Sequence, residues 1–174
     1  LIEVHRFWEQ NCTAYMATPY YQGRTLKERL QESPLSYGEV ELRRVLMPVL
    51  DALQHMHAEQ VYHRDISPDN IMILEDGRPI LLDLGAARRL EAENVQALTV
   101  LVKPGYAPIE QYAGDAEVQQ GPWTDIYGWG ATAYFALTGK PPPPSASRIM
   151  SDSIIKLSLR QLPQLQSARF SQAF

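Results

Sequence analysis

The chain has 174 residues, of which 45% are hydrophobic and 21% are charged, so its composition is that of an ordinary folded domain rather than a disordered chain. The formal net charge of −4 argues against a broad basic surface for nucleic acid. A single cysteine, Cys12, excludes an internal disulfide framework and a multi-cysteine zinc site, and it is typical of a protein in the reducing cytoplasm.

The first predicted elements are two strands joined by a tight turn. Residues 3–9 and 13–18 are short runs of mixed apolar character, and Asn11-Cys12 lies between them. Residues 19–23 are then expected to connect the second strand to the first helix.

Two capping boxes predict the starts of the next two helices, because in each a Ser or Thr precedes a Glu by three residues. The pairs are Thr25 with Glu28 and Ser36 with Glu39. The first pair predicts a short helix over 26–32. After the second, apolar residues keep a helical spacing and predict a helix over about 38–59, which Pro48 is expected to bend or to deprive of one backbone hydrogen bond.

A β-hairpin is predicted in the middle of the chain. Residues 71–74 and 80–82 are apolar runs, and the segment between them contains Asp76-Gly77, a pair that favours a hairpin turn. Residues 86–123 show little periodicity and are expected to form a long loop with one helical turn. A loop of that length in a folded domain is usually functional or disordered.

The last long helix is predicted over 124–138, where Gly128 and Gly130 permit close packing against a neighbour. Gly139 and the prolines after it form a helix-stop signal. The longest mostly apolar stretch lies inside this helix and is about half the length that a membrane-spanning helix needs, so no membrane segment is expected. One or two short helices are expected after residue 145.

Two motifs carry chemically active side chains. Residues 63–70 are His-Arg-Asp-Ile-Ser-Pro-Asp-Asn, and residues 83–85 are Asp-Leu-Gly. With them the chain resembles eukaryotic-type protein kinases, and most of all their bacterial serine/threonine branch. The first segment is similar to the catalytic-loop pattern H-R-D-L-x-x-x-N and the second to D-F-G. Either motif alone is common by chance, but here both occur in order on either side of a predicted hairpin.

The resemblance implies a phosphotransfer site that uses ATP and Mg²⁺. Asp65 is expected to orient the attacking hydroxyl and to accept its proton, while Asn70 and Asp83 hold Mg²⁺ at the nucleotide phosphates. The predicted hairpin brings Asn70 and Asp83 to one mouth. Taken singly, Asp65 is also compatible with a loop cap, and Asp83 with a turn residue at a strand end.

The same resemblance assigns structural roles to three further residues. Residues 104–111 are similar to the P-G-Y-x-A-P-E-Q stretch that closes the kinase activation segment, where Glu110 is expected to pair with a distant arginine. Residues 125–130 resemble the start of the central helix of the large lobe. Asp125 is expected to anchor the catalytic-loop backbone, the alternative being a first-turn acid favoured by the helix dipole. His63 is expected to pack beneath the loop.

Arg64 suggests regulation, because in this family the arginine can bind a phosphate on the activation segment. Thr99 is the candidate acceptor, since it is the only Ser or Thr between Gly85 and Lys103. The alternative is that Arg64 satisfies local carbonyl groups, and the sequence favours neither interpretation.

The sequence departs from the family at two positions that we interpret together. Most of these kinases carry a lysine two residues after the catalytic aspartate, where this chain has Ser67, and a threonine just before Pro-Gly-Tyr, where it has Lys103. We hypothesise that the two groups are exchanged, so that the Lys103 amine reaches the transferring phosphate and Ser67 supplies the hydroxyl. The alternative is an exposed lysine and a loop that tolerates serine.

The resemblance also predicts how the chain is divided. The segments are 1–18 for the last strands of the small lobe, 19–23 for the hinge and 24–174 for the large lobe, with its last helices incomplete. Thr18 is the expected gatekeeper beside the adenine pocket, with Pro19 and Tyr21 backbone groups available to adenine. Since no glycine-rich loop is visible, we expect the small lobe to be largely absent and this chain by itself to transfer phosphate negligibly.

The predicted fold is therefore α+β and protein-kinase-like, a mostly α-helical large lobe with a catalytic β-hairpin. The predicted function of the parent protein is transfer of the ATP γ-phosphate to Ser or Thr hydroxyls of a protein substrate in the cytoplasm, with no nucleic-acid partner. One alternative is a pseudokinase or docking module, which retention of Asp65, Asn70 and Asp83 opposes. Another is a small-molecule kinase of the aminoglycoside or choline type, which the segment 105–111 opposes.

Overall fold

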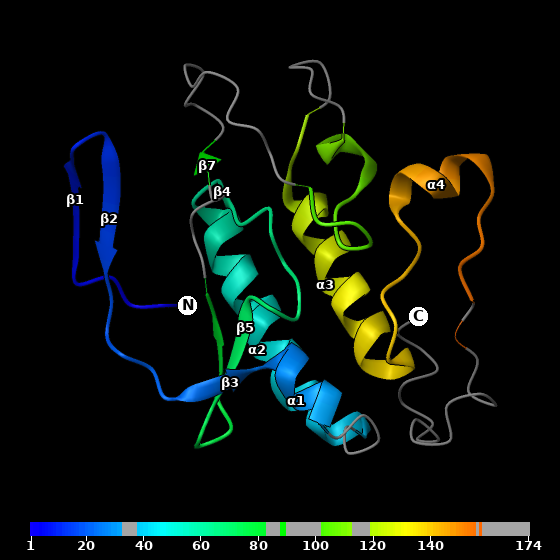
Figure 1. The fold of residues 1–174 in the computed structure, drawn as a ribbon, viewed down its shortest axis with the longest axis horizontal. Helices are drawn as coiled ribbons and strands as arrows, with labels where there is room; N and C mark the ends of the chain where they lie inside the picture. The colour runs from blue at the N-terminus through cyan, green and yellow to red at the C-terminus, as the bar shows by residue number, and fades with distance from the viewer. Residues whose placement is uncertain (33–37, 83–87, 90–101, 113–118, 156, 158–174) are drawn as a thin grey trace.

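The computed structural model describes residues 1–32, 38–82, 88–89, 102–112, 119–155 and 157. Two long helices, α2 (Glu39–Ala58) and α3 (Pro122–Thr138), pack against each other at the centre of this part of the chain (Figure 1). Their facing sides and the neighbouring strands supply the hydrophobic core. A hairpin of β1 (Arg6–Gln10) and β2 (Thr13–Ala17) stands to the left of the helices in this view.

The β1–β2 hairpin has the tight turn that the sequence predicts. Asn11 and Cys12 have φ values of 52° and 56°, and positive φ at both central residues is typical of a type I′ turn. The antiparallel register places Trp8 opposite Tyr15, and their rings stack at a centroid distance of 5.3 Å. The two predicted strands are thus confirmed, although β1 begins three residues later and ends one residue later than predicted, and β2 ends one residue earlier.

The short helix α1 (Leu26–Glu32) follows directly on strand β3 (Gly23–Thr25). Its capping box is formed in both directions: the Thr25 amide donates to Glu28 Oε2 at 2.8 Å, and the Glu28 amide donates to Thr25 Oγ1 at 3.2 Å. The box satisfies two amides that a helix start would otherwise leave unpaired, so both the predicted helix and its cap are confirmed.

Helix α2 continues without interruption through Pro48. Its buried residues recur at helical spacing along one face: Leu42, Val45, Leu46, Val49, Leu53 and Met56. Pro48 lies on the opposite, exposed face, where water can bond the carbonyl that has lost its amide partner. The predicted helix is confirmed, although Gly38 is its N-cap and Ser36, the expected cap, lies outside the described residues.

Strands β5 (Ile71–Leu74) and β6 (Pro79–Leu81) form the predicted hairpin, and β3 adds to it in the antiparallel order β3-β5-β6. Gly77 takes a φ of +84° in the turn, a conformation that glycine adopts without strain. At the open end of the hairpin, the Leu82 amide donates to the Asn70 carbonyl at 2.8 Å. The hairpin therefore brings the end of the 63–70 loop beside the residue that follows β6.

Residues 86–123 contain more regular structure than the sequence predicts. Strand β7 (Arg88–Arg89) pairs antiparallel with β4 (Val61–Tyr62), and a 3₁₀ turn, η2, covers Ile109–Gln111. A strand of two residues is too short to leave an alternating pattern, and it forms only because a distant partner is available. The expected helical turn is found at η2, whereas the expectation of a loop was wrong at β7.

Helix α3 begins at Pro122, two residues before the predicted start, because proline is well tolerated in the first turn of a helix. It ends at Gly139, which has a φ of +72° and donates its amide to the Phe135 carbonyl at 2.8 Å, so the predicted stop is confirmed. A short helix expected after residue 145 is found as α4 (Ser145–Met150). Among the described residues, no helix is both long enough and apolar enough to cross a membrane.

Two glycines of α3 differ in the space around them. A Cβ built on Gly128 would lie 2.8 Å from the backbone oxygen of Ile66, whereas a Cβ on Gly130 meets no described atom within 4 Å. The predicted close packing is confirmed for Gly128 and wrong for Gly130. We expect Gly128→Ala to lower the free energy of unfolding by about 1–3 kcal/mol, because the added methyl group forces α3 away from the loop that contains Ile66.

The matched control is Gly130→Ala in the same helix. It is expected to leave the free energy of unfolding unchanged or to raise it by up to about 1 kcal/mol, because alanine favours a helix over glycine. Chemical denaturation of both variants measures the difference. Equal effects of the two substitutions would contradict the close contact at Gly128.

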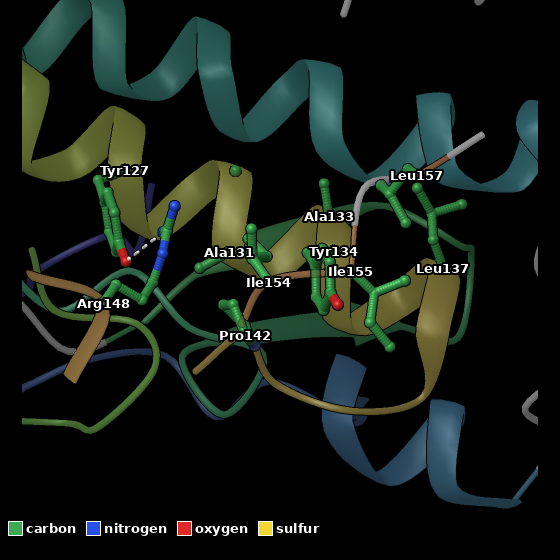
Figure 2. A pocket seen from close by; sticks show the side chains of 11 residues that line it. Tyr127, Ala131, Ala133, Tyr134, Leu137, Pro142, Arg148, Ile154, Ile155 and Leu157 are labelled. Carbon is green, nitrogen blue, oxygen red and sulfur yellow. Dashed lines mark hydrogen bonds between the residues drawn. The ribbon is translucent and has the colours of Figure 1, made fainter. Parts of the chain in front are cut away.

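An apolar cavity of about 430 Å³ lies between α3 and the segment that follows it (Figure 2). Tyr134 lines it from α3, and Ile154 and Ile155 line it from the segment after α4. At one end, Arg148 Nη1 donates to the Tyr127 hydroxyl at 3.4 Å. None of the predicted site residues within the described part of the chain lines this cavity, so it is separate from the described part of the site below.

Candidate active site

The loop 63–70 connects β4 to β5 and contains a strained residue that is held from both sides. Arg64 has a φ of 67°, which is costly for a residue with a side chain. Its amide donates to Asp125 Oδ1 at 2.6 Å, and its carbonyl accepts from Gln111 Nε2 at 2.7 Å. Because both peptide groups of Arg64 are fixed, the direction in which the next residue, Asp65, leaves the backbone is fixed as well.

Asp125 lies in the first turn of α3 with only 1% of its surface exposed. Besides the Arg64 amide, its carboxylate accepts from the His63 amide at 2.9 Å and contacts His57 Nε2 at 2.7 Å. A buried carboxylate needs such partners, because desolvation of an unpaired charge is very costly. These contacts join the start of α3 to the loop and to the end of α2, and they include His57, to which the sequence analysis gave no role.

His63 is fully buried beneath the loop. The Asp65 amide donates to His63 Nδ1 at 3.3 Å, so the ring proton is assigned to Nε2, which donates to the Leu82 carbonyl at 2.9 Å. The ring thus connects the loop to the end of β6. Both of its nitrogens are used in these structural contacts.

Asp65 and Asn70 are five positions apart in the loop, but their side chains lie next to each other. Asn70 Nδ2 donates to the backbone carbonyl of Asp65 at 2.8 Å and to Asp65 Oδ2 at 2.7 Å. Both of these oxygens only accept, so the amide is oriented with Nδ2 toward Asp65 and its own oxygen is left for another partner. Asp65 Oδ1 accepts no hydrogen bond from the described residues. Asp83, predicted to join them, lies outside the described residues.

The Lys103 side chain reaches into the loop. Its Nζ donates to Ser67 Oγ at 2.7 Å, and it lies 3.2 Å from Asp69 Oδ2 and 3.9 Å from Asp65 Oδ1. The other oxygen of Asp69 lies 2.8 Å from Lys27 Nζ. Partial burial opposes ionisation of Asp69, but the two lysines outweigh it and lower the pKa of this carboxyl, so it is charged at neutral pH. The Lys103 ammonium is therefore placed among one hydroxyl and two carboxylates.

A small cavity of about 60 Å³ opens beside Asp65 and Lys103. It is lined by Arg64, Asp65, Ile66, Val102, Lys103, Tyr106, Ala107 and Gln111. Burial, and to a lesser degree the charge of Asp69, raises the pKa of the Tyr106 phenol, which stays protonated. The volume suits a group the size of a side-chain hydroxyl rather than a nucleotide.

Glu110, which the resemblance expected to pair with an arginine, accepts from Thr124 Oγ1 at 2.9 Å. This contact connects η2 to the first turn of α3. The arginines nearest the end of the chain, Arg160 and Arg169, lie outside the described residues, and so does Thr99, the predicted phosphate acceptor. The described partner of Glu110 is therefore the neutral hydroxyl of Thr124. The pairing of Glu110 with an arginine stays a prediction.

The connector between β2 and β3 contains the residues predicted to contact adenine. Thr18 Oγ1 donates to the Pro19 carbonyl at 3.3 Å, and the Tyr21 hydroxyl accepts from the Glu3 amide at 3.1 Å. Both contacts are local to the first part of the chain. They leave the proposed nucleotide contacts of this connector as predictions.

Besides His57, the structure brings three residues to the site that the sequence analysis did not single out: Asp69, Gln111 and Lys27. Asp69 contacts Lys103 and Lys27, and Gln111 holds the Arg64 carbonyl. Asp69 lies inside the motif 63–70 and Gln111 ends the segment 104–111, so the sequence analysis covered both positions but not their partners. Nothing in the sequence around Lys27 indicates its contact with the loop.

The fold is similar to that of a solved structure described as the apo form of PpkA-294, with a TM-score of 0.77 and 43% sequence identity over 95% of this chain and 57% of that chain. Curated relatives include the serine/threonine-protein kinase PknA of Nostoc sp., 33% identical over 80% of this chain and 25% of its own length. Serine/threonine-protein kinase F of Synechocystis sp. is 34% identical over 80% of this chain and 28% of its own. This chain thus spans about a quarter of the length of these relatives.

The fold and the loop sequence together define a protein-kinase-like domain, as the sequence predicts. A family model described as the protein kinase domain matches residues 1–172, and the chain belongs to the protein kinase family. The predicted similarity to the bacterial serine/threonine branch is confirmed by the names and sources of the relatives.

Proposed function

We propose that the protein to which these residues belong is an ATP- and Mg²⁺-dependent kinase that phosphorylates Ser or Thr hydroxyls of protein substrates. The observation that carries the proposal is the meeting of Asp65, Asn70 and Lys103, with Asn70 at 2.7 Å and Lys103 at 3.9 Å from the Asp65 carboxylate. Phosphoryl transfer asks a protein mainly for positioning and charge compensation. A carboxylate, an amide oxygen and an ammonium group supply both.

Asp65 is the proposed base for the substrate hydroxyl. Its Oδ2 is held by Asn70, and its Oδ1 is the oxygen that accepts nothing from the described residues. A substrate hydroxyl in the adjoining cavity would donate to Oδ1 and lose its proton there as it attacks. The clamped backbone of Arg64 keeps this carboxylate in one orientation, which lowers the entropic cost of the reactive geometry.

The donor chemistry at Asn70 fits Mg²⁺. Both hydrogen bonds of the amide toward Asp65 use Nδ2, so the amide oxygen, a hard ligand, is left for a cation. We propose that Asn70 and Asp83 would hold the ion. An ion held there would supply positive charge that compensates the charge of the nucleotide phosphates.

Lys103 is proposed to supply the positive charge that a lysine at position 67 supplies in most of the family. The hydrogen bond from its Nζ to Ser67 Oγ supports this exchange, because it brings the amine to the loop position where the family lysine begins. The short distance from Nζ to Asp65 keeps the charge near the attacking group. An ammonium fixed in advance stabilises charge on the phosphoryl oxygens without reorganisation during the reaction.

The remaining assignments are part of the same proposal. Thr18, Pro19 and Tyr21 would border the adenine, in a connector that joins the last small-lobe strands to the large lobe. Arg64 would bind a phosphate placed on Thr99, which would connect activation to the same loop.

The full-length protein tests the proposal directly. It is incubated with γ-labelled ATP, Mg²⁺ and generic acceptor proteins in reducing buffer, because Cys12 is exposed and we place the protein in the cytoplasm. We expect labelled phosphoserine or phosphothreonine that disappears when the metal is chelated. Binding of Mg·ATP without transfer would instead favour a docking module, and labelling of aminoglycosides or choline would favour a small-molecule kinase.

The exchange hypothesis predicts a specific effect at Lys103. Lys103→Met is expected to lower kcat by about 10²-fold with a smaller change in KM for ATP, because the charge acts mainly on the transition state. Lys140→Met, at an exposed lysine just after α3, is the control and should leave both constants unchanged. Initial rates at several ATP concentrations measure the two effects. Equal rates for the two variants would contradict the exchange.

A further inference from the structure

Asp69 lies between two lysines that come from different parts of the chain. Its Oδ1 lies 2.8 Å from Lys27 Nζ in α1, and its Oδ2 lies 3.2 Å from Lys103 Nζ. We propose that Asp69 is a positioning residue, which holds the Lys103 ammonium beside Ser67, and that Lys27 in turn fixes the Asp69 carboxylate. This inference rests on the proposed role of Lys103 in phosphotransfer.

Lys103 needs such a partner because its side chain is long, flexible and close to a competing carboxylate. Four rotatable bonds separate its charge from the backbone, and a third of the side chain is exposed. Asp65 Oδ1 lies 3.9 Å away, beyond hydrogen-bond distance but near enough to attract the ammonium. Without Asp69, the Lys103 ammonium would pair directly with the Asp65 carboxylate. Asp65 could then no longer act as the base, and Lys103 could no longer contact the phosphate. Asp69 supplies an opposite charge on the other side and keeps the two groups apart.

Lys27 is itself anchored to the loop through its backbone. The Lys27 amide donates to the Pro68 carbonyl at 3.1 Å, one residue before Asp69. The capping box at Thr25 fixes the same first turn of α1. The backbone of Lys27 is therefore fixed to the loop, and its side-chain amine neutralises Asp69 from this fixed position. This limits the orientations that the Asp69 carboxylate can take.

Kinetics of the full-length protein test this inference. Asp69→Asn keeps the shape and removes the charge, so kcat is expected to fall by about 10- to 100-fold while KM for ATP changes much less. Asp69→Glu restores the charge and should recover a large part of kcat. The kcat of Lys27→Met should lie between those of Asp69→Asn and the wild type. The control is Asp76→Asn, which removes another ion-paired aspartate, at the tip of the β5–β6 hairpin, and should behave as the wild type.

A second measurement reports on the position of Lys103 without any need for activity. Acylation with a limiting lysine-selective reagent, quantified by mass spectrometry, should modify Lys103 several-fold faster in Asp69→Asn than in the wild type, with Lys140 as the internal reference. Equal labelling rates of Lys103 in Asp69→Asn and in the wild type would overturn the positioning role. A wild-type kcat in Asp69→Asn would also overturn it if Lys103→Met has a reduced kcat. In both cases the proposed function would stand. Should the wild type transfer no phosphate, the proposed function fails and the labelling rates alone decide whether Asp69 holds Lys103.

Discussion

Asp65→Asn is expected to lower kcat by about 10³-fold while the affinity for Mg·ATP stays within a few-fold of the wild type. Asparagine has nearly the same shape, and its oxygen can still accept the hydrogen bond that Asn70 donates to Oδ2 at 2.7 Å. It cannot accept the proton of the attacking hydroxyl, so the chemical step is lost while the loop is kept. Steady-state kinetics and calorimetric titration with Mg·ATP measure the two quantities separately.

The matched control for this change is Asp51→Asn, at an exposed position of α2, which removes the same charge from the surface. It is expected to leave kcat unchanged. Asp65→Asn activity above about a tenth of the wild-type rate would be too high for a lost general base and would contradict the assignment. Equal losses in both variants would point to a non-specific effect of the charge.

Asp125→Ala is expected to lower the free energy of unfolding by about 3 kcal/mol or more. The substitution removes the acceptor from the amides of His63 and Arg64 and from the ring of His57, all in a part of the structure that water hardly reaches. It also releases the strained conformation of Arg64, so kcat should fall with stability. Urea denaturation of the variant and the wild type measures the loss.

Two comparisons make this result specific. Asp125→Asn keeps one accepting oxygen and the volume of the side chain, so its loss of stability should be clearly smaller than that of Asp125→Ala. Asp51→Ala, at the exposed position of α2, should cost little. A loss in Asp125→Ala no larger than that in Asp51→Ala would contradict the anchoring role.

Features set by residues within a few positions of each other were predictable from the sequence. The Thr25–Glu28 capping box, the Asn11-Cys12 turn and the stop at Gly139 all depend on short-range hydrogen bonds and backbone conformation. The loop 63–70 was found in a different way, through its motif. Local chemistry and motif together therefore gave the fold class and the location of the site.

Contacts between distant segments were not predictable in the same way. The bond from Gln111 to Arg64 spans 47 positions and the bond from Lys103 to Ser67 spans 36, so both depend on how the segments between them fold. The motif resemblance suggested the second contact but not the first. Gly128 and Gly130 make the same point within one helix, because only the rotation of α3 decides which of them faces Ile66.

Gln111 and Lys103 belong to one short segment, 102–112, and each holds a different part of the loop 63–70. If this segment detaches, the clamp on the Arg64 carbonyl and the ammonium beside Ser67 leave together. The loop and the segment then gain or lose their working arrangement as one cooperative unit. Changes in the free energy of unfolding from substitutions in the loop and in the segment 102–112 are consequently not additive, because the contacts of each depend on the other being in place.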